Sequence, residues 1–182
     1  MKIVGISGSL RKGSFNTALL LAAAEVSPKD CVLEIASIRG IPLYDGDMEK
    51  EIGIPEAVVK LKERIAVADG LLLATPEYNS SIPGVLKNAI DWLSRPPEDI
   101  PWVFANRPVG IIGATPGQGG TRFSQTAWLP VLRSLGARAW FGRQLYVSQA
   151  AGLFDGSGKL VDEKTRGRLE SFMEGFAAFV KG

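Results

Sequence analysis

The sequence of 182 residues contains no histidine and a single cysteine, Cys31. Without an imidazole the chain cannot build a Ser-His-Asp or Cys-His nucleophilic site, and histidine-held metal sites and thiolate clusters are excluded as well. Cys31 leads into an apolar segment, which favours a reduced and buried thiol over a reactive one. An enzyme of this composition has to use carboxylates, lysine or tyrosine, or take its chemistry from an organic cofactor.

Long apolar runs and basic stripes are also missing. No run approaches the roughly 18 apolar residues that a membrane span needs, and the first residues are typical of a strand rather than of a signal peptide. The 21 lysines and arginines are scattered and nearly balanced by 19 acidic residues, which argues against a nucleic-acid partner. We therefore expect one domain over residues 1–182, cytoplasmic, with neither membrane nor nucleic acid as a partner.

Apolar segments alternate with helical patterns along the chain, which is typical of repeated βα units and a parallel sheet. Strands are expected at residues 2–7, 31–36, 70–75, 109–114 and within 137–147. Helices are expected at 17–24, around 54–65, at 83–94, at 122–135 and around 169–180, and the proline-rich residues 95–108 at a connecting loop. Five parallel strands flanked by helices describe a flavodoxin-like, doubly wound α/β fold with strand order 2-1-3-4-5.

Residues 8–16, GSLRKGSFN, lie between the first strand and the first helix. Glycines permit a tight turn, the helix directs free N–H groups at the loop, and Ser9, Arg11, Ser14 and Asn16 add donors. The loop lacks both the Gly-x-Gly-x-x-Gly spacing and a Gly-Lys-Ser/Thr ending, so it favours a mononucleotide monophosphate over NAD or ATP. An ordinary βα turn is the alternative.

The crevice of such a sheet lies where the first and third strands end. The loop after the third strand, TPEYNSSIPG at 75–84, has prolines that fix the backbone, so that the N–H groups of Glu77, Tyr78 and Asn79 can face a flat ligand beside the Tyr78 ring. That arrangement suits an isoalloxazine, although a plain turn before a helix is the alternative. A third loop, 115–121, carries three glycines at the same edge and permits either close approach to a ligand or simple flexibility.

With these motifs the sequence resembles the NADPH-dependent FMN reductases of the flavodoxin-like superfamily, and among them the bacterial chromate and quinone reductases. The resemblance covers nearly the whole chain through residues 8–16, 41–45, 75–79 and 83–95. It implies a cofactor site for FMN, with the phosphate and then the ring held by Ser9, Arg11, Ser14, Phe15, Asn16, Pro76, Glu77, Tyr78, Asn79 and Thr115. Thr115 stands where relatives often have serine. Family members are commonly dimers or tetramers, so the resemblance implies a homodimer or homotetramer.

The leading hypothesis is an NAD(P)H oxidoreductase that passes hydride from NADPH or NADH to FMN and then to a quinone, chromate, an azo or nitro compound, or free flavin. No catalytic side chain and no metal is predicted. The alternative is a non-catalytic flavodoxin-type carrier or redox sensor, but such carriers are usually strongly acidic and this chain has a net charge of +2. A serine hydrolase would lack its histidine. Lys12, Arg122 and Arg143 are candidates for contacting a 2′-phosphate.

Two further sets of residues are interpreted structurally. Lys87 and Asp91 are spaced to pair on one helix face, and Trp92 is expected to fill the core or a subunit contact. Three more large aromatics, in or near long loops, are expected at the rim of the crevice, where they would cover the ring or seal an interface: Trp102, Phe104 and Trp128.

Overall fold

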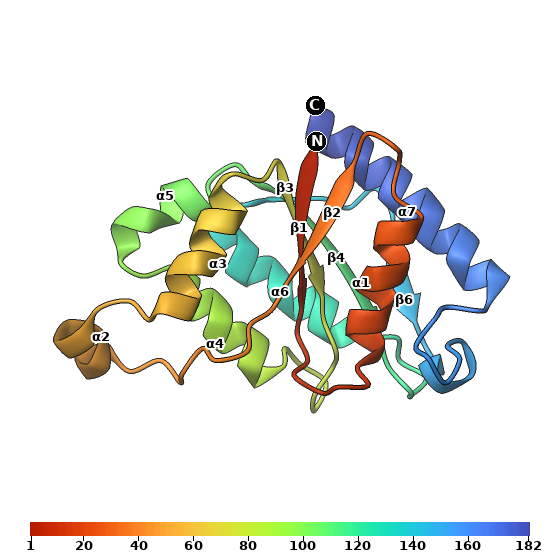
Figure 1. Cartoon of the computed structure of the whole chain (residues 1–182), viewed down its shortest axis with the longest axis horizontal. Coiled ribbons are helices and arrows are strands. Elements are labelled where there is room, and N and C mark those ends of the chain that lie inside the picture. The colour runs from red at the N-terminus through yellow and green to blue at the C-terminus, as the bar shows by residue number, and fades with distance from the viewer.

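The computed structural model describes residues 1–182 as a parallel sheet between two layers of helices (Figure 1). The strands are β1 (Lys2–Ser7), β2 (Val32–Ala36), β3 (Gly70–Ala74), β4 (Pro108–Ala114), β5 (Arg138–Ala139) and β6 (Leu145–Val147). The helices are α1 (Phe15–Glu25), α2 (Gly46–Ile52), α3 (Glu56–Ala66), α4 (Gly84–Leu93), α5 (Ile100–Val103), α6 (Arg122–Ser134) and α7 (Glu163–Lys181), with short 3₁₀ turns at Pro97–Asp99 and Ala150–Gly152.

The strand order is β2-β1-β3-β4-β5, with β6 also paired to β4 and every pair parallel. The predicted fold class and order are confirmed. The fifth strand is split, however, because the chain between β5 and β6 turns Trp140 toward α7, where its ring meets Phe172 edge-on at 4.8 Å between centroids. Both short strands continue the sheet along β4, so the edge is formed in two pieces rather than one.

Each face of the sheet buries its own apolar cluster. One cluster joins the sheet to α1 and α7, and the other joins it to α3, α4 and α6; Figure 1 shows α1 and α7 together on one side. Every residue of β3 is buried, as a central strand covered by helices on both faces requires. This burial fixes the strand ends, and with them the loops that follow β1, β3 and β4.

The helix predicted around residues 54–65 corresponds to α3, and a second helix that was not predicted, α2, precedes it. Gly53 ends α2 with a φ of +75°, and Pro55 precedes α3. A left-handed glycine and a proline together stop one helix and start the next. The proline-rich run 95–108 was expected to be a plain loop and instead contains the short helix α5.

The segment before α2 is held against α4 by side chains of that helix. Asn88 Nδ2 and the Trp92 indole N–H both donate to the Pro42 carbonyl, at 2.8 and 2.9 Å. Trp92 is fully buried, which confirms its expected role in the core. An ion pair between Arg95 Nε and Glu49 at 2.9 Å ties α2 to the end of α4, and the hydrogen bond from that guanidinium lowers the pKa of the Glu49 carboxyl.

The expectation for the other aromatics is largely wrong. Phe104 and Trp128 are fully buried rather than at a rim. Trp102 is half exposed, but it lies in α5, which precedes β4 and therefore sits toward the opposite end of the sheet from the crevice (Figure 1).

The predicted ion pair of Lys87 and Asp91 is confirmed, with Lys87 Nζ 2.7 Å from Asp91 Oδ1. None of the helices combines the length and apolar character that crossing a bilayer requires.

Candidate functional site

Three loops meet in one cleft at the carboxyl end of the sheet, which we name the three-loop cleft. Its volume is about 210 Å³. The loops after β1, β3 and β4 supply its walls, and these include every predicted cofactor residue except Asn79: Ser9, Arg11, Ser14, Phe15, Asn16, Pro76, Glu77, Tyr78 and Thr115. Ala114 and Pro116 also line it and were not predicted. Neither has a polar side chain, so nothing in the sequence marks them as ligand contacts.

The loop after β1, residues 8–14, is termed the phosphate loop from here on. Ser14 caps α1, its hydroxyl accepting from Thr17 N at 3.2 Å. The main-chain N–H groups of Gly13, Phe15 and Asn16 have no acceptor within the chain, as expected for the first turn of a helix. Arg11 is exposed and pairs with no carboxylate. One free guanidinium and the free N–H groups of Phe15 and Asn16 therefore border the same cleft, and together they suit a dianion.

Asn16 contributes differently from what the sequence suggests. Its amide is 3% exposed, with Nδ2 donating to Ala114 O and Oδ1 accepting from Ala114 N, both at 2.9 Å. Both polar atoms of the side chain thus bind the end of β4, and only the main-chain N–H of Asn16 is free for a ligand. The side chain instead ties the first turn of α1 to the end of β4, across 98 positions of sequence.

The loop after β3 is a tight turn at Tyr78–Ser81. Tyr78 N donates to Ser81 O at 3.2 Å and Ser81 N donates back at 3.1 Å, with Asn79 and Ser80 at φ +50° and +58°. Two left-handed residues between a mutually bonded pair form a type I′ turn. The N–H of Tyr78 was expected to face a ligand and is used by this turn. Those of Glu77 and Asn79 have no acceptor within the chain, and Asn79 lies at the exposed tip.

Glu77 caps the start of α6 from a different loop. Its Oε2 accepts from Phe123 N at 2.8 Å and from Ser124 N at 3.1 Å. The residue that precedes α6, Thr121, makes no side-chain cap and has a φ of +63°. A carboxylate there satisfies two N–H groups and meets the positive end of the helix dipole. The Glu77 side chain thus anchors its own loop to α6.

A buried hydroxyl pair strengthens this link. Thr75 Oγ1 lies 2.8 Å from Ser124 Oγ, and the Trp128 indole N–H donates to Thr75 Oγ1 at 3.2 Å. All three side chains are fully buried. Hydrogen bonds of this kind, shielded from water, are costly to break. The loop after β3 is therefore held to α6 at Thr75 and again at Glu77.

Substitution of Glu77 tests the cap. Glu77→Ala should lower the free energy of unfolding by about 1 kcal/mol, because two N–H groups lose their acceptor. Glu77→Gln should cost less, since the amide oxygen still accepts and only the charge is lost. Urea unfolding of FMN-free protein measures both, with the exposed Glu98→Ala as the matched control. Equal stabilities of the glutamine and alanine variants would contradict the cap.

The loop after β4 is fixed by main-chain bonds. Thr115 N donates to Val147 O at 2.9 Å and Ala150 N donates to Thr115 O at 3.0 Å. The Thr115 hydroxyl accepts from Gly117 N at 3.2 Å, so the threonine shapes its own turn. Its O–H remains able to donate into the cleft. The predicted contact at Thr115 therefore fits a hydroxyl donor, as serine would provide in relatives.

The residues of the three-loop cleft fit FMN chemically. A guanidinium and helix N–H groups suit its phosphate, and Pro76 with the half-exposed ring of Tyr78 offers flat apolar surface for the isoalloxazine. The main-chain N–H of Glu77, which lines the cleft and has no acceptor within the chain, would suit its polar edge, whereas Asn79 does not line the cleft.

Comparisons with known proteins place the chain among FMN-dependent reductases. Residues 1–152 match the family model described as NADPH-dependent FMN reductase. The chain is 42% identical to an NAD(P)H-dependent FMN reductase of Pseudomonas aeruginosa, over all of this chain and 96% of that protein. It is 40% identical to a 2-hydroxy-1,4-benzoquinone reductase of a Burkholderia species, over all of this chain and 97% of that protein. Among solved structures, the flavoenzyme NAD(P)H:(acceptor) oxidoreductase of Paracoccus denitrificans superposes with a TM-score of 0.88 at 31% identity, covering 99% of this chain and 97% of that one.

Proposed function

The chain belongs to the NADPH-dependent FMN reductase family, and we propose that it binds FMN in the three-loop cleft and passes two electrons from NAD(P)H to a small quinone. Membership makes it an oxidoreductase that uses FMN and NAD(P)H. The observation that carries the assignment of the site is the convergence of three loops, remote in sequence, on one cleft bordered by Arg11 and free helix N–H groups.

The side chains bind and orient rather than react. Arg11 and the N–H groups of Phe15 and Asn16 would hold the phosphate, and Pro76, which precedes the Tyr78–Ser81 turn, would support the ring. FMN, when bound, supplies a ring that accepts hydride from a nicotinamide and delivers it to an acceptor. The overall change is NAD(P)H plus a quinone plus one proton giving NAD(P)⁺ and a hydroquinone. A chain without histidine is suited to this division of labour, because its task is to position and to stabilise charge.

A quinone is proposed as the acceptor on two grounds. The Burkholderia relative is named for a benzoquinone and matches this chain end to end at 40% identity. At the mouth of the cleft, Tyr78 is 44% exposed and offers an aromatic surface to a planar acceptor. Homodimeric or homotetrameric assembly belongs to the same proposal and is supported by the exposed rings of Phe123 and Phe141, which are 60% and 66% accessible in the single chain.

Stopped-flow absorbance tests the function. FMN-loaded protein mixed anaerobically with NADPH should lose its visible flavin absorbance rapidly, and subsequent mixing with 1,4-benzoquinone should restore it. Chromate, an azo dye and free FMN are mixed in parallel and should restore it more slowly than the quinone. Absence of bleaching by either NADPH or NADH would favour a carrier and contradict the proposal. Bleaching followed by faster recovery with chromate or the dye would overturn the quinone assignment alone.

A further inference from the structure

A second cleft lies on the outer side of the phosphate loop. It has a volume of about 230 Å³ and is bounded by that loop and by the residues that follow β2. Ser9 and Arg11 line both this cleft and the three-loop cleft. The two clefts therefore share part of the phosphate loop as a wall, and we name the second one the outer cleft.

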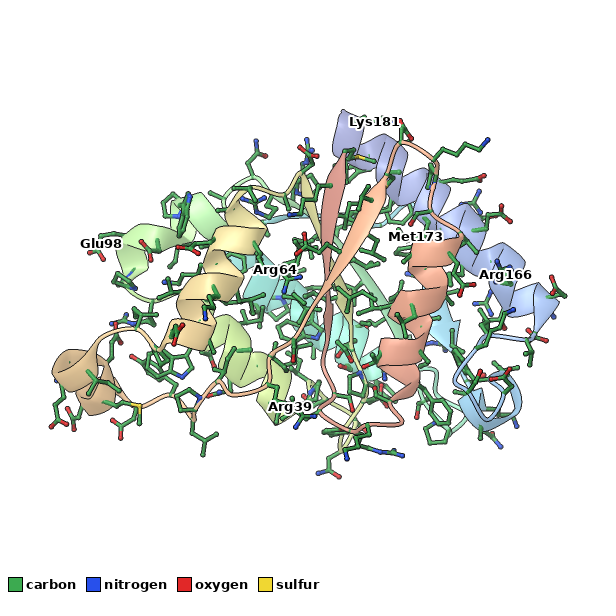
Figure 2. The ribbon with its side chains drawn as sticks, in the orientation of Figure 1. Arg39, Arg64, Glu98, Arg166, Met173 and Lys181 are labelled. Carbon is green, nitrogen blue, oxygen red and sulfur yellow. The ribbon has the colours of Figure 1, made fainter.

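The outer cleft is cationic. Arg11 and Arg39 both line it, no aspartate or glutamate does, and neither arginine forms an ion pair. Arg39 Nη2 donates to the carbonyl of Leu10 at 2.6 Å, which holds its guanidinium against the phosphate loop while its other N–H groups have no acceptor. Figure 2 shows Arg39 beside this loop at the carboxyl end of the sheet. Four hydroxyl-bearing residues also line the outer cleft: Ser7, Ser9, Thr17 and Ser37.

The nearest carboxylate on β2 is already neutralised elsewhere. Glu34 pairs with Arg64 and with Lys2, and the hydrogen bond from the Lys2 ammonium lowers the pKa of the Glu34 carboxyl. Glu34 does not line the outer cleft. With Arg11 assigned to the FMN phosphate, Arg39 is the guanidinium left for the outer cleft, and with hydroxyls beside it and no competing carboxylate it suits a phosphate monoester.

The position of the outer cleft favours one phosphate monoester by comparison with dinucleotide-binding sheets, although here the loop itself is proposed to hold the FMN phosphate rather than a pyrophosphate. In dinucleotide-binding sheets, the residues at the end of the second strand lie beside the glycine-containing loop of the first, and they select the adenosine ribose. A carboxylate there binds the free 2′-hydroxyl, whereas an arginine accommodates a 2′-phosphate. Here β2 ends at Ala36, and Arg39 follows with no carboxylate before Asp45. Ile38 adds an apolar wall.

We propose that the outer cleft binds the 2′-phosphate of NADPH and that Arg39 is the residue by which the protein distinguishes NADPH from NADH. This rests on the proposed function, because it takes the dinucleotide to be the electron donor. The three residues that the sequence suggests as contacts for the 2′-phosphate do not line the outer cleft. Arg122 lies over the ring of Tyr146, at 5.2 Å from its centroid, and Arg143 borders a groove along α7. Lys12 lines neither cleft.

The proposal is tested by calorimetric titration of FMN-loaded protein with adenosine 2′,5′-bisphosphate, with 5′-AMP as the probe that lacks the 2′-phosphate. Arg39→Gln should weaken binding of the bisphosphate by about tenfold or more, the loss expected for one charged hydrogen-bonding partner. Binding of 5′-AMP should change by less than about twofold, since a mutation outside its contacts has little effect. The exposed Arg133→Gln, which removes the same charge from α6, is the matched control and should change neither. In steady-state kinetics, Arg39→Gln should lower kcat/KM for NADPH by the same factor and leave that for NADH unchanged.

Three outcomes would overturn the inference. Bisphosphate binding could be insensitive to Arg39→Gln. FMN affinity could fall together with bisphosphate affinity, which would make Arg39 a support of the phosphate loop through Leu10. Binding of inorganic phosphate could depend on Arg39 while binding of the bisphosphate does not, which would make the outer cleft an anion site unrelated to NADPH. Failure of the proposed function is separate, because it would appear as wild-type protein that takes up no FMN or is bleached by neither nicotinamide.

Discussion

Arg11→Ala is expected to weaken FMN binding by about tenfold to a hundredfold, the loss of one charge-assisted contact to a phosphate. Arg11 borders the three-loop cleft, is exposed, and has no carboxylate partner. Its guanidinium therefore contributes little to the folded chain itself. The free energy of unfolding of FMN-free protein should change by no more than about 0.5 kcal/mol, as for other surface substitutions.

Fluorescence titration of FMN into the apoprotein measures this effect, and the neighbouring cation supplies its control. Lys12→Ala removes the same charge one residue away, but Lys12 does not line the three-loop cleft. Its effect on FMN affinity should stay within about threefold and should vanish at high salt, because only long-range attraction is lost. Equal losses from Arg11→Ala and Lys12→Ala would mean that net charge rather than a contact binds the phosphate. An unchanged affinity in Arg11→Ala would remove the phosphate loop from the site.

The parts of the fold that the sequence predicts well are those governed by local patterns. The all-apolar run of β3 identifies a central strand, and Gly136, at φ +69°, ends α6 where the sequence places its end. Helix α2 is not predicted, although Gly53 and Pro55, both typical helix breakers, mark its end. None of its residues is buried, so no apolar periodicity identifies it, whereas the helix predicted around 54–65 corresponds to α3.

The parts of the site that the sequence does not predict depend on contacts across the sheet. A polar side chain in a loop looks available to a ligand until its partner is known. Asn16 and Glu77 are both such residues: one binds the end of β4 and the other caps α6. A weak signal for the second exists, because α6 begins after Thr121 with no acidic residue in its first turn. A helix lacking its own cap needs an acceptor from elsewhere, but no local pattern says from which loop it comes.

These contacts give the three-loop cleft a common frame. Asn16 joins the first turn of α1 to the end of β4, and Glu77 and Thr75 join the loop after β3 to α6. Gly8 packs the first loop directly against the third strand's loop, since a Cβ there would lie 2.9 Å from Pro76 Cδ. Each loop is thus positioned by another, so the geometry offered to FMN depends on side chains that need not touch it.

Gly113→Ala should disrupt this frame more than any change at its surface. Gly113 lies in β4, and a Cβ on it would collide with Thr121 Oγ1 and with the main-chain carbonyl oxygen of Thr75. The Thr121 hydroxyl can rotate away, but the Thr75 carbonyl belongs to the end of β3, which leads into Pro76 and the Tyr78–Ser81 turn that we propose supports the FMN ring. Overpacking against such an atom costs about 1–3 kcal/mol. We expect a loss near the upper end of that range, together with FMN affinity reduced by at least about tenfold.

The control lies on the same strand. The atoms nearest to a Cβ on Gly110 are side-chain atoms of Leu72 and Phe176, at 3.3 Å. Because those side chains can adjust, Gly110→Ala should cost less in urea unfolding and leave FMN affinity within about threefold. Adding Thr121→Gly to Gly113→Ala removes one of the two collisions and suits the left-handed φ at that position. The double variant should therefore recover part of the FMN affinity, a non-additive result that marks direct contact. If Gly113→Ala instead binds FMN as tightly as Gly110→Ala, the end of β4 does not position the ring-binding turn, and the frame inferred from these contacts does not govern the site.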